Sequence, residues 1–225
     1  PFAAFTFEPA EPKPGEPVRF SYQPSEGAST PVRYAWDFDG DGVPDSTDAA
    51  PEQTFTQSKR TLVSLVVTDE TGRNSLPIAQ AIPVGGAVGG DMQLDSEEPP
   101  ARSSETLESI NQQPYWGRAF RHDGDIKKGR AGVTYPFTIE QPGRYALYIS
   151  TTAPGGRSTR TPVTISYGEF SETVRVNQNN VSNPFGLVRV GVYDLPAGAA
   201  VTVRITNDGT DNYTIFDLVR LVKQP

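Results

Sequence analysis

The sequence predicts an all-β protein made of two β-sandwiches, and three observations lead to this fold class. Apolar and polar residues alternate over short runs, which is the period of a strand with one buried face. Glycine and proline number 21 each among 225 residues, and they separate these runs as turns do. Helical spacing is rare, because only Ser104–Gln112 allows one or two helical turns. Many short strands with regular turns are typical of sandwiches and jelly rolls.

The individual strands follow from the alternating runs and the turn residues that bound them. In the first part of the chain we expect strands at Val18–Tyr22, Val32–Phe38, Thr61–Asp69 and Ile78–Val84. In the second part we expect them at Val133–Ile139, Arg144–Thr151, Pro162–Tyr167, Phe170–Gln178, Leu187–Leu195, Ala200–Asn207 and Thr214–Val222.

A glycine-rich segment marks the boundary between two domains. Gly85–Gly90 holds four glycines in six residues and has the composition of a flexible linker. We therefore expect a first domain at residues 1–86, a linker at 87–91 and a second domain at 92–225. Most of the acidity belongs to the first domain, where 12 Asp and Glu residues face 6 Lys and Arg residues.

The composition excludes several classes of function. With no cysteine the chain has no disulfide, no thiolate nucleophile and no Cys-ligated metal, and its single histidine excludes a His-rich metal centre. A net charge of −7 argues against nucleic-acid binding. No apolar run approaches the ~18 residues of a membrane span. No nucleophile elbow or phosphate-binding loop is present, so we predict that the chain is not an enzyme. The composition does not exclude a pair of catalytic carboxylates, because sequence alone does not show which carboxylates lie close together in the fold.

The segment with the most candidate metal ligands is an acidic loop at residues 37–48. Its carboxylates stand at loop positions 1, 3, 5, 9 and 12, with a glycine at position 6 and a carbonyl at position 7. This is the ligand order of a calcium-binding EF-hand loop. The candidate ligands are Asp37, Asp39, Asp41, the carbonyl of Val43, Asp45 and Asp48. The alternative is a solvated hairpin turn, in which Asp and Gly residues are equally common.

The residues around this loop resemble the PKD domain. The resemblance rests on Tyr34–Gly42, Thr54-Phe55 and Val63–Asp69, with Pro14–Phe20 leading into them. It covers roughly residues 1–85. It implies an Ig-like sandwich that serves as a spacer on extracellular proteins, with Trp36 in its core. Several members bind Ca²⁺ and many do not.

The second part resembles the carbohydrate-binding-like domain at the C-terminus of xanthan lyases and golvesin. The matching patches are Arg121–Gly129, Gly143–Tyr148, Val174–Gln178, Ile205–Tyr213 and Asp217–Val222, in the order of that family. The resemblance covers about residues 92–223. It implies a jelly-roll sandwich, a polysaccharide or cell-surface glycan as partner, and a secreted or cell-surface location.

Candidate ligand-binding residues lie on the loops of this second domain. Sugars stack on exposed aromatic rings, and polar side chains bind their hydroxyls. Tyr115 and Trp116 on a Pro/Gly-bounded loop form one candidate platform, and Tyr213 is a second loop aromatic. The alternative is that Trp116 fills the end of the sandwich. The remaining candidates are Arg118, Arg121, His122, Lys127 and Arg157, although His122 equally fits a hydrogen-bonding loop residue.

Charge favours an anionic ligand for the same region. Eight basic residues face three acidic ones between Arg118 and Arg160, which suits steering of a carboxylated glycan. The alternative is that these side chains are scattered over several faces. Asp217, inside the last expected strand, needs a partner or an ion if it is buried, so a second Ca²⁺ site there is a further alternative.

Three functional hypotheses follow. The leading one is a non-catalytic extracellular accessory module, monomeric or part of a larger protein, that binds a polysaccharide through its second domain. The second is a structural or adhesive module without specific sugar affinity. The third is a fragment of a secreted polysaccharide-degrading enzyme, or a small hydrolase or lyase that uses carboxylates.

Overall fold

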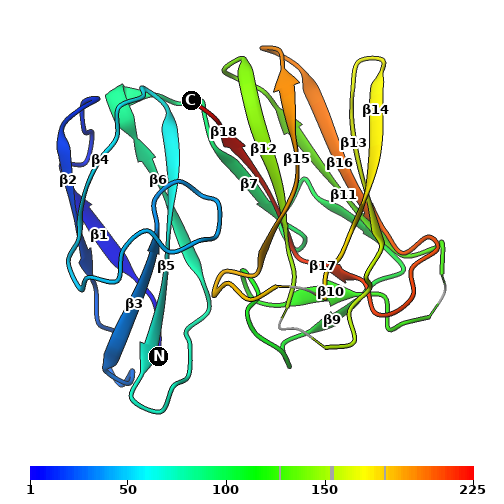
Figure 1. Ribbon diagram of the computed structural model, residues 1–225, viewed down its shortest axis with the longest axis horizontal. Helices are drawn as coiled ribbons and strands as arrows, with labels where there is room; N and C mark the ends of the chain where they lie inside the picture. Colours follow the sequence, from blue (N-terminus) through cyan, green and yellow to red (C-terminus); the bar gives the residue numbers. More distant parts are fainter. Residues whose placement is uncertain (127, 153–154, 180) are drawn as a thin grey trace. The chain divides into compact units, whose positions relative to one another are not determined.

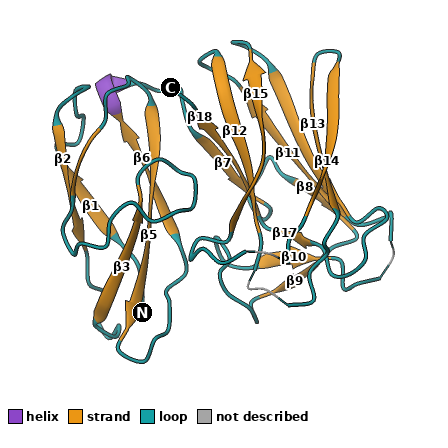
Figure 2. Cartoon of the chain, viewed as in Figure 1, coloured by secondary structure: helices purple, strands orange, loops and turns teal. Residues whose placement is uncertain are grey.

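Strands joined by loops make up nearly all of the molecule, which confirms the all-β prediction (Figure 2). The structure is a computed structural model that describes residues 1–126, 128–152, 155–179 and 181–225. Within these residues the single helical element is a 3₁₀ turn, η1 (Val84–Gly86). The chain divides into two compact units, one over Pro1–Asp91 together with Asn183–Phe185 and Pro225, and the other over Met92–Ser182 and Gly186–Gln224. None of the helical segments in the described ranges is long and apolar enough to span a bilayer.

The first unit is a sandwich of two three-stranded antiparallel sheets (Figure 1). One sheet has the order β1-β2-β4, with β1 (Phe5–Glu8), β2 (Pro17–Tyr22) and β4 (Glu52–Thr54). The other has the order β3-β5-β6, with β3 (Pro31–Asp37), β5 (Arg60–Asp69) and β6 (Ile78–Pro83). Aromatic side chains from both sheets fill the core, and Trp36 lies among them, as expected.

The second unit is a larger antiparallel sandwich with a five-stranded and a four-stranded sheet. The five-stranded sheet is ordered β14-β13-β16-β11-β8, from β8 (Arg102–Ser104), β11 (Gly132–Thr138), β13 (Thr161–Tyr167), β14 (Phe170–Val176) and β16 (Ala200–Thr206). The four-stranded sheet is ordered β15-β12-β18-β7, from β7 (Met92–Asp95), β12 (Gly143–Ser150), β15 (Leu187–Leu195) and β18 (Leu218–Lys223). Apolar side chains of both sheets form one core, as alternation of buried and exposed residues requires.

A third, small sheet of the second unit has the order β17-β10-β9. Its strands are β9 (Leu107–Ser109), β10 (Phe120–His122) and β17 (Ile215–Phe216). Directly opposed residues of antiparallel strands share a face. His122 opposes Leu107 and Ile215 on one face, and Arg121 opposes Glu108 and Phe216 on the other. This sheet therefore separates two chemically different environments.

Two local expectations are wrong. Ser104–Gln112 forms no helical turn: it contains β9, and Glu105 has a left-handed φ of 50° that a helix does not accommodate. The expected single strand Thr214–Val222 is interrupted between β17 and β18, at Asp217.

In the segment predicted as a flexible linker, Gly89 accepts a hydrogen bond from the Arg60 amide at 2.7 Å, and the Asp91 amide donates to the Arg60 carbonyl at 2.8 Å. That part of the segment is therefore hydrogen bonded to β5.

Candidate functional site

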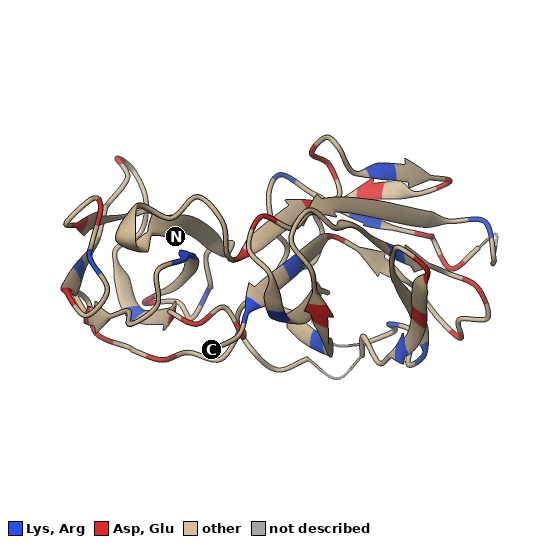
Figure 3. Cartoon of the chain, turned by 90° about the horizontal axis from the view of Figure 1, so that it is seen from above, with Lys and Arg blue, Asp and Glu red and all other residues tan. Residues whose placement is uncertain are grey.

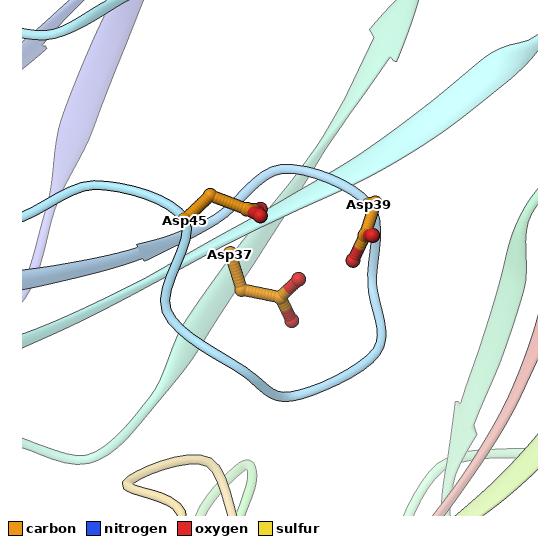
Figure 4. Close-up of side chains that lie close together, drawn as sticks. All are labelled: Asp37, Asp39 and Asp45. Atoms are coloured by element: carbon orange, nitrogen blue, oxygen red, sulfur yellow. The ribbon is translucent and has the colours of Figure 1, made fainter.

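The acidic loop brings three of its carboxylates together. Ligand oxygens of Asp37, Asp39 and Asp45 lie within 4.8 Å of one another, and the three side chains point into the space that the loop encloses (Figure 4). Asp41 and Asp48 do not belong to this group. The loop thus gathers part of the predicted ligand set, and a hard oxygen-binding cation is the ligand class that such a group fits.

The same carboxylates are hydrogen bonded to backbone amides of their own loop. Both oxygens of Asp37 accept hydrogen bonds, from Gly40 N–H at 2.7 Å and Gly42 N–H at 3.1 Å. Asp45 Oδ2 accepts one from Phe38 N–H at 2.6 Å, and Asp39 accepts one from Asp41 N–H at 3.2 Å. These hydrogen bonds are the ones expected if the aspartates build a tight turn, which is the alternative to a metal site.

The other predicted metal ligands play local roles. Asp41 accepts a hydrogen bond from Val43 N–H at 2.7 Å, and the Val43 side chain is exposed. The carbonyl of Asp48 accepts the indole N–H of Trp36 at 2.9 Å, which ties the loop to the core. Burial, followed by the charges of Asp41 and Asp45, raises the pKa of Asp39 to about 6.

A pocket of about 290 Å³ lies in the second unit and gathers three of the predicted ligand-binding residues. His122 enters it from the small sheet, and Arg157 and Tyr213 enter it from two loops joined by an isolated β-bridge. Its wall is formed by Asn111, Gln112, Phe120, His122, Arg157, Tyr213 and Ile215. The combination of aromatic rings, two carboxamides and one guanidinium is the composition expected of a sugar-binding pocket.

Arg157 is the most informative member of the pocket. It is only 8% exposed, and its Nε donates to Thr152 Oγ1 at 2.8 Å, while one Nη donates to the Gly155 carbonyl at 3.3 Å. Within the described ranges, no carboxylate forms an ion pair with its guanidinium. Burial lowers the pKa of Arg157, although arginine keeps its charge. The pocket therefore contains a desolvated cation that no carboxylate of the described residues pairs with.

His122 and Tyr213 form an aromatic pair beside this cation. Their ring centroids lie 6.0 Å apart, and the ring of Phe120 lies 5.9 Å from His122. His122 Nδ1 accepts a hydrogen bond from Gly124 N–H at 3.0 Å, so Nε2 carries the proton of the neutral ring. Burial, together with the charge of Arg157, lowers the pKa of His122 against the opposing effect of Asp123. The ring is thus a neutral stacking surface with an N–H donor.

Asp123 fixes the loops around the pocket rather than facing a ligand. It is buried and accepts hydrogen bonds from Thr214 N–H, Asp125 N–H and the Asn207 carboxamide, all at 2.9–3.0 Å. Lys128 pairs with it at 3.1 Å. These bonds outweigh the burial cost and lower the pKa of Asp123.

The other predicted ligand-binding residues lie elsewhere. Tyr115 and Trp116 are buried and do not form an exposed platform; Trp116 packs under Arg220, whose guanidinium carbon lies 4.8 Å from the ring centroid. Arg118 is exposed, 3.9 Å from Glu97, and Arg121 lies on the opposite face of the small sheet from His122. Lys127 lies outside the described residues. Lys and Arg residues of the second unit are spread over several strands and loops instead of one patch (Figure 3).

Sequence reasoning missed four residues of the pocket wall: Asn111, Gln112, Phe120 and Ile215. Phe120 stands two positions before His122, so a strand placed at residues 120–122 would have put both on one face. Asn111 and Gln112 are a polar pair in a loop, and nothing in their own composition identifies a pocket.

Comparison with known proteins places both units in known families. Residues 98–223 match the model of the Golvesin C-terminal domain, and residues 1–82 match that of the PKD domain. No protein of curated function matches the sequence. Among solved structures, a Paenibacillus xanthan lyase is 19% identical with a TM-score of 0.57, over 100% of this chain and 25% of the lyase. The chain therefore spans about a quarter of the lyase, and this likeness concerns the fold.

Two further structures resemble about three-fifths of the chain. The GH26-CBM35 β-(1,4)-mannanase of Podospora anserina is 22% identical with a TM-score of 0.46, over 61% of this chain and 28% of the mannanase. The CBM35 module of Cellvibrio japonicus Abf62 is 14% identical with a TM-score of 0.43, over 60% of this chain and 94% of that module.

Proposed function

Because this chain belongs to the Golvesin C-terminal domain family, we propose that it is a non-catalytic extracellular accessory module whose second unit binds polysaccharide. The ligand site is the pocket around His122, Arg157 and Tyr213. The PKD unit serves as a spacer.

The observation that carries the proposal is the buried guanidinium of Arg157. A desolvated cation without a carboxylate partner binds an anion that enters its pocket more strongly than an exposed one does. Tyr213 and His122 offer ring faces beside it, and Asn111 and Gln112 offer amide groups for hydroxyls. A glycan that carries a carboxylate, such as a uronic acid, satisfies all of these groups at once.

The test is affinity electrophoresis of the full chain in gels that contain either a uronate-rich or a neutral polysaccharide. We expect retention by the uronate-rich polymer, and a loss of about tenfold in affinity for Tyr213→Ala, because ring stacking contributes ~1 kcal/mol or more. Arg157→Gln is expected to remove the preference for the acidic polymer.

The matched control is Phe170→Ala on β14. Phe170 is 40% exposed and Tyr213 39%, so the two substitutions remove similar exposed aromatic surface from different places. Equal losses for both variants would contradict the pocket as the binding site. No retention on any polysaccharide would favour a structural or adhesive module, and release of reducing ends or unsaturated products by the chain would establish catalysis.

For the first unit, we propose a calcium ion at the acidic loop, held by Asp37, Asp39 and Asp45. Their oxygens suit a hard cation. The pKa of Asp39 is raised first by burial and then by the charges of Asp41 and Asp45, and a cation would counter both effects. The hydrogen bonds that these carboxylates already accept limit what the ion adds, so the site is expected to be weak.

A further inference from the structure

A second group of acidic residues lies inside the second unit, on the side of the small sheet opposite the pocket face. Asp95 ends β7 and stands opposite Leu218 of β18 in the ladder, next to Asp217. The carbonyl of Asp217 accepts the Ser96 amide at 2.6 Å, and Glu97 follows directly. We call Asp95, Glu97 and Asp217 the buried acid cluster.

The cluster is almost inaccessible to water. Asp217 is 0% and Asp95 6% exposed, and the side chain of Glu97 is 5% exposed. Carboxyl groups are rarely buried to this degree unless they are paired. Three of them in one place therefore require an explanation.

Protein hydrogen bonds reach only two of the six carboxylate oxygens of the cluster. Asp217 Oδ2 accepts the Trp116 amide at 3.1 Å and the Ser150 hydroxyl at 2.8 Å, and one oxygen of Asp95 accepts the Glu97 amide at 2.8 Å. Within the described ranges, the other oxygen of Asp217, the other oxygen of Asp95 and both oxygens of Glu97 have no hydrogen-bond donor. Asp95 Oδ2 lies 2.6 Å from the position that a Cβ on Gly117 would take, so it faces backbone.

The charges around the cluster do not neutralise it. Burial, followed by the nearby Asp95 charge, raises the pKa of Asp217 well above its usual range, and burial raises that of Asp95 to about 7. Burial and contact with Glu108 raise the pKa of Glu97. Arg121 lowers the pKa of Asp95 and Glu97, but Arg118 is largely exposed and 3.9 Å from Glu97.

We propose that Asp95, Glu97 and Asp217 bind a divalent cation in the interior of the second unit. Their donor atoms are all oxygens, which Ca²⁺ prefers, whereas typical zinc sites include His nitrogen or Cys sulfur, which this cluster lacks. The carboxylates are spread more widely than the 4.8 Å group of the acidic loop, so binding includes rotation of their side chains towards the ion. The ion supplies the charge that the buried oxygens lack.

The cation also fixes a loop that serves the pocket. The Trp116 amide donates to Asp217, and Gly117 packs on Asp95. Asn111 and Gln112, which line the pocket, belong to the same connection between β9 and β10. A cation bound to the cluster therefore stabilises this connection through Asp95 and Asp217. The cation site itself does not depend on sugar binding.

The experiment is hydrogen-exchange mass spectrometry of the full, chelator-treated chain, with and without millimolar Ca²⁺. We expect Ca²⁺ to slow exchange at least tenfold in peptides that cover residues 110–118 and β18. Asp217→Asn, which keeps the volume and the hydrogen-bond acceptor, is expected to abolish this protection. The control Asp39→Asn/Asp45→Asn removes two carboxylates from the acidic loop and is expected to leave it intact.

A shared proton is the competing explanation, because a protonated carboxyl group also relieves the repulsion. In that case Asp217→Asn exchanges like the parent chain, and Ca²⁺ leaves residues 110–118 and β18 unchanged. Either result overturns the proposal. Calorimetric titration with Ca²⁺ gives an independent reading: the heat of one binding event must disappear in Asp217→Asn and persist in the control.

Discussion

The two acidic regions of this protein differ in how the repulsion between their neighbouring carboxylates is reduced. The acidic loop of the first unit is tightly grouped and mostly open to water, and backbone amides of the loop bind its oxygens. The buried acid cluster of the second unit is looser and almost inaccessible to water, and four of its six oxygens have no donor within the described ranges. Proximity of carboxylates is thus a poor guide to a cation site. The number of oxygens left unsatisfied after burial is a better one.

The largest effect that separates the two regions is expected for Asp37→Ala. Asp37 is buried, and its two oxygens accept the amides of Gly40 and Gly42, which stay buried and unpaired in the variant. Each of the two lost partners costs about 1–3 kcal/mol, so the first unit should lose roughly 4 kcal/mol of unfolding free energy.

Hydrogen exchange in β5 peptides measures this loss, and it should be the same with Ca²⁺ and with chelator. Asp48→Ala is the matched control, because its side chain is exposed and only its carbonyl contacts Trp36. A loss that appears only in Ca²⁺ would show that Asp37 acts mainly as a metal ligand, and the contrast between the two regions would disappear.

The sequence predicts the long strands that carry these two regions, but not the short ones. Most of the strands predicted from the alternation of residues agree with their observed bounds within one residue, because one buried face imposes a period of two. Strands of three or four residues, such as β7, β9 and β10, contain too few alternations to be recognised. The helical expectation at Ser104–Gln112 failed for the same reason.

The candidate sites were predictable to different degrees. The acidic loop is contiguous, so the spacing of its aspartates was sufficient to find it. The pocket combines His122 with Arg157 and Tyr213 from distant loops, and the partners Asn111 and Gln112 carry no signal of their own. Asp217 was recognisable as a carboxylate in a strand, but Asp95 and Glu97 join it only through the pairing of β7 with β18. Such pairings join distant segments, and the sequence of neither segment alone predicts its partner.

The next effect concerns pH. In chelator, Asp95 of the folded chain keeps its proton up to a pKa of about 7, whereas in the unfolded chain it loses it near 3.8. Between these values the folded state binds more protons, so raising the pH through this window weakens the second unit. We expect a decrease of roughly 2 to 4 kcal/mol in its unfolding free energy from pH 4 to pH 8.

Exchange in β18 peptides, measured in chelator and in Ca²⁺, tests this expectation. Calcium should flatten the dependence, because the ion replaces the proton as the counter-charge. Asp39 also has a raised pKa, about 6, but it is exposed, so solvent screening makes its contribution to the first unit much smaller. A first unit that responds to pH as strongly as the second would contradict the contrast.

The smallest effect is expected from calcium at the acidic loop. An ion there competes with amide donors that already bind Asp37, Asp39 and Asp45, and it stays exposed to screening. Millimolar Ca²⁺ should therefore slow exchange in peptides covering residues 37–48 by no more than about threefold, which corresponds to ~0.6 kcal/mol. Chelator should reverse this change, and Asp39→Asn should remove it. A tenfold or larger protection would mean that the ion displaces the amides and that the loop, despite its satisfied oxygens, is the stronger site.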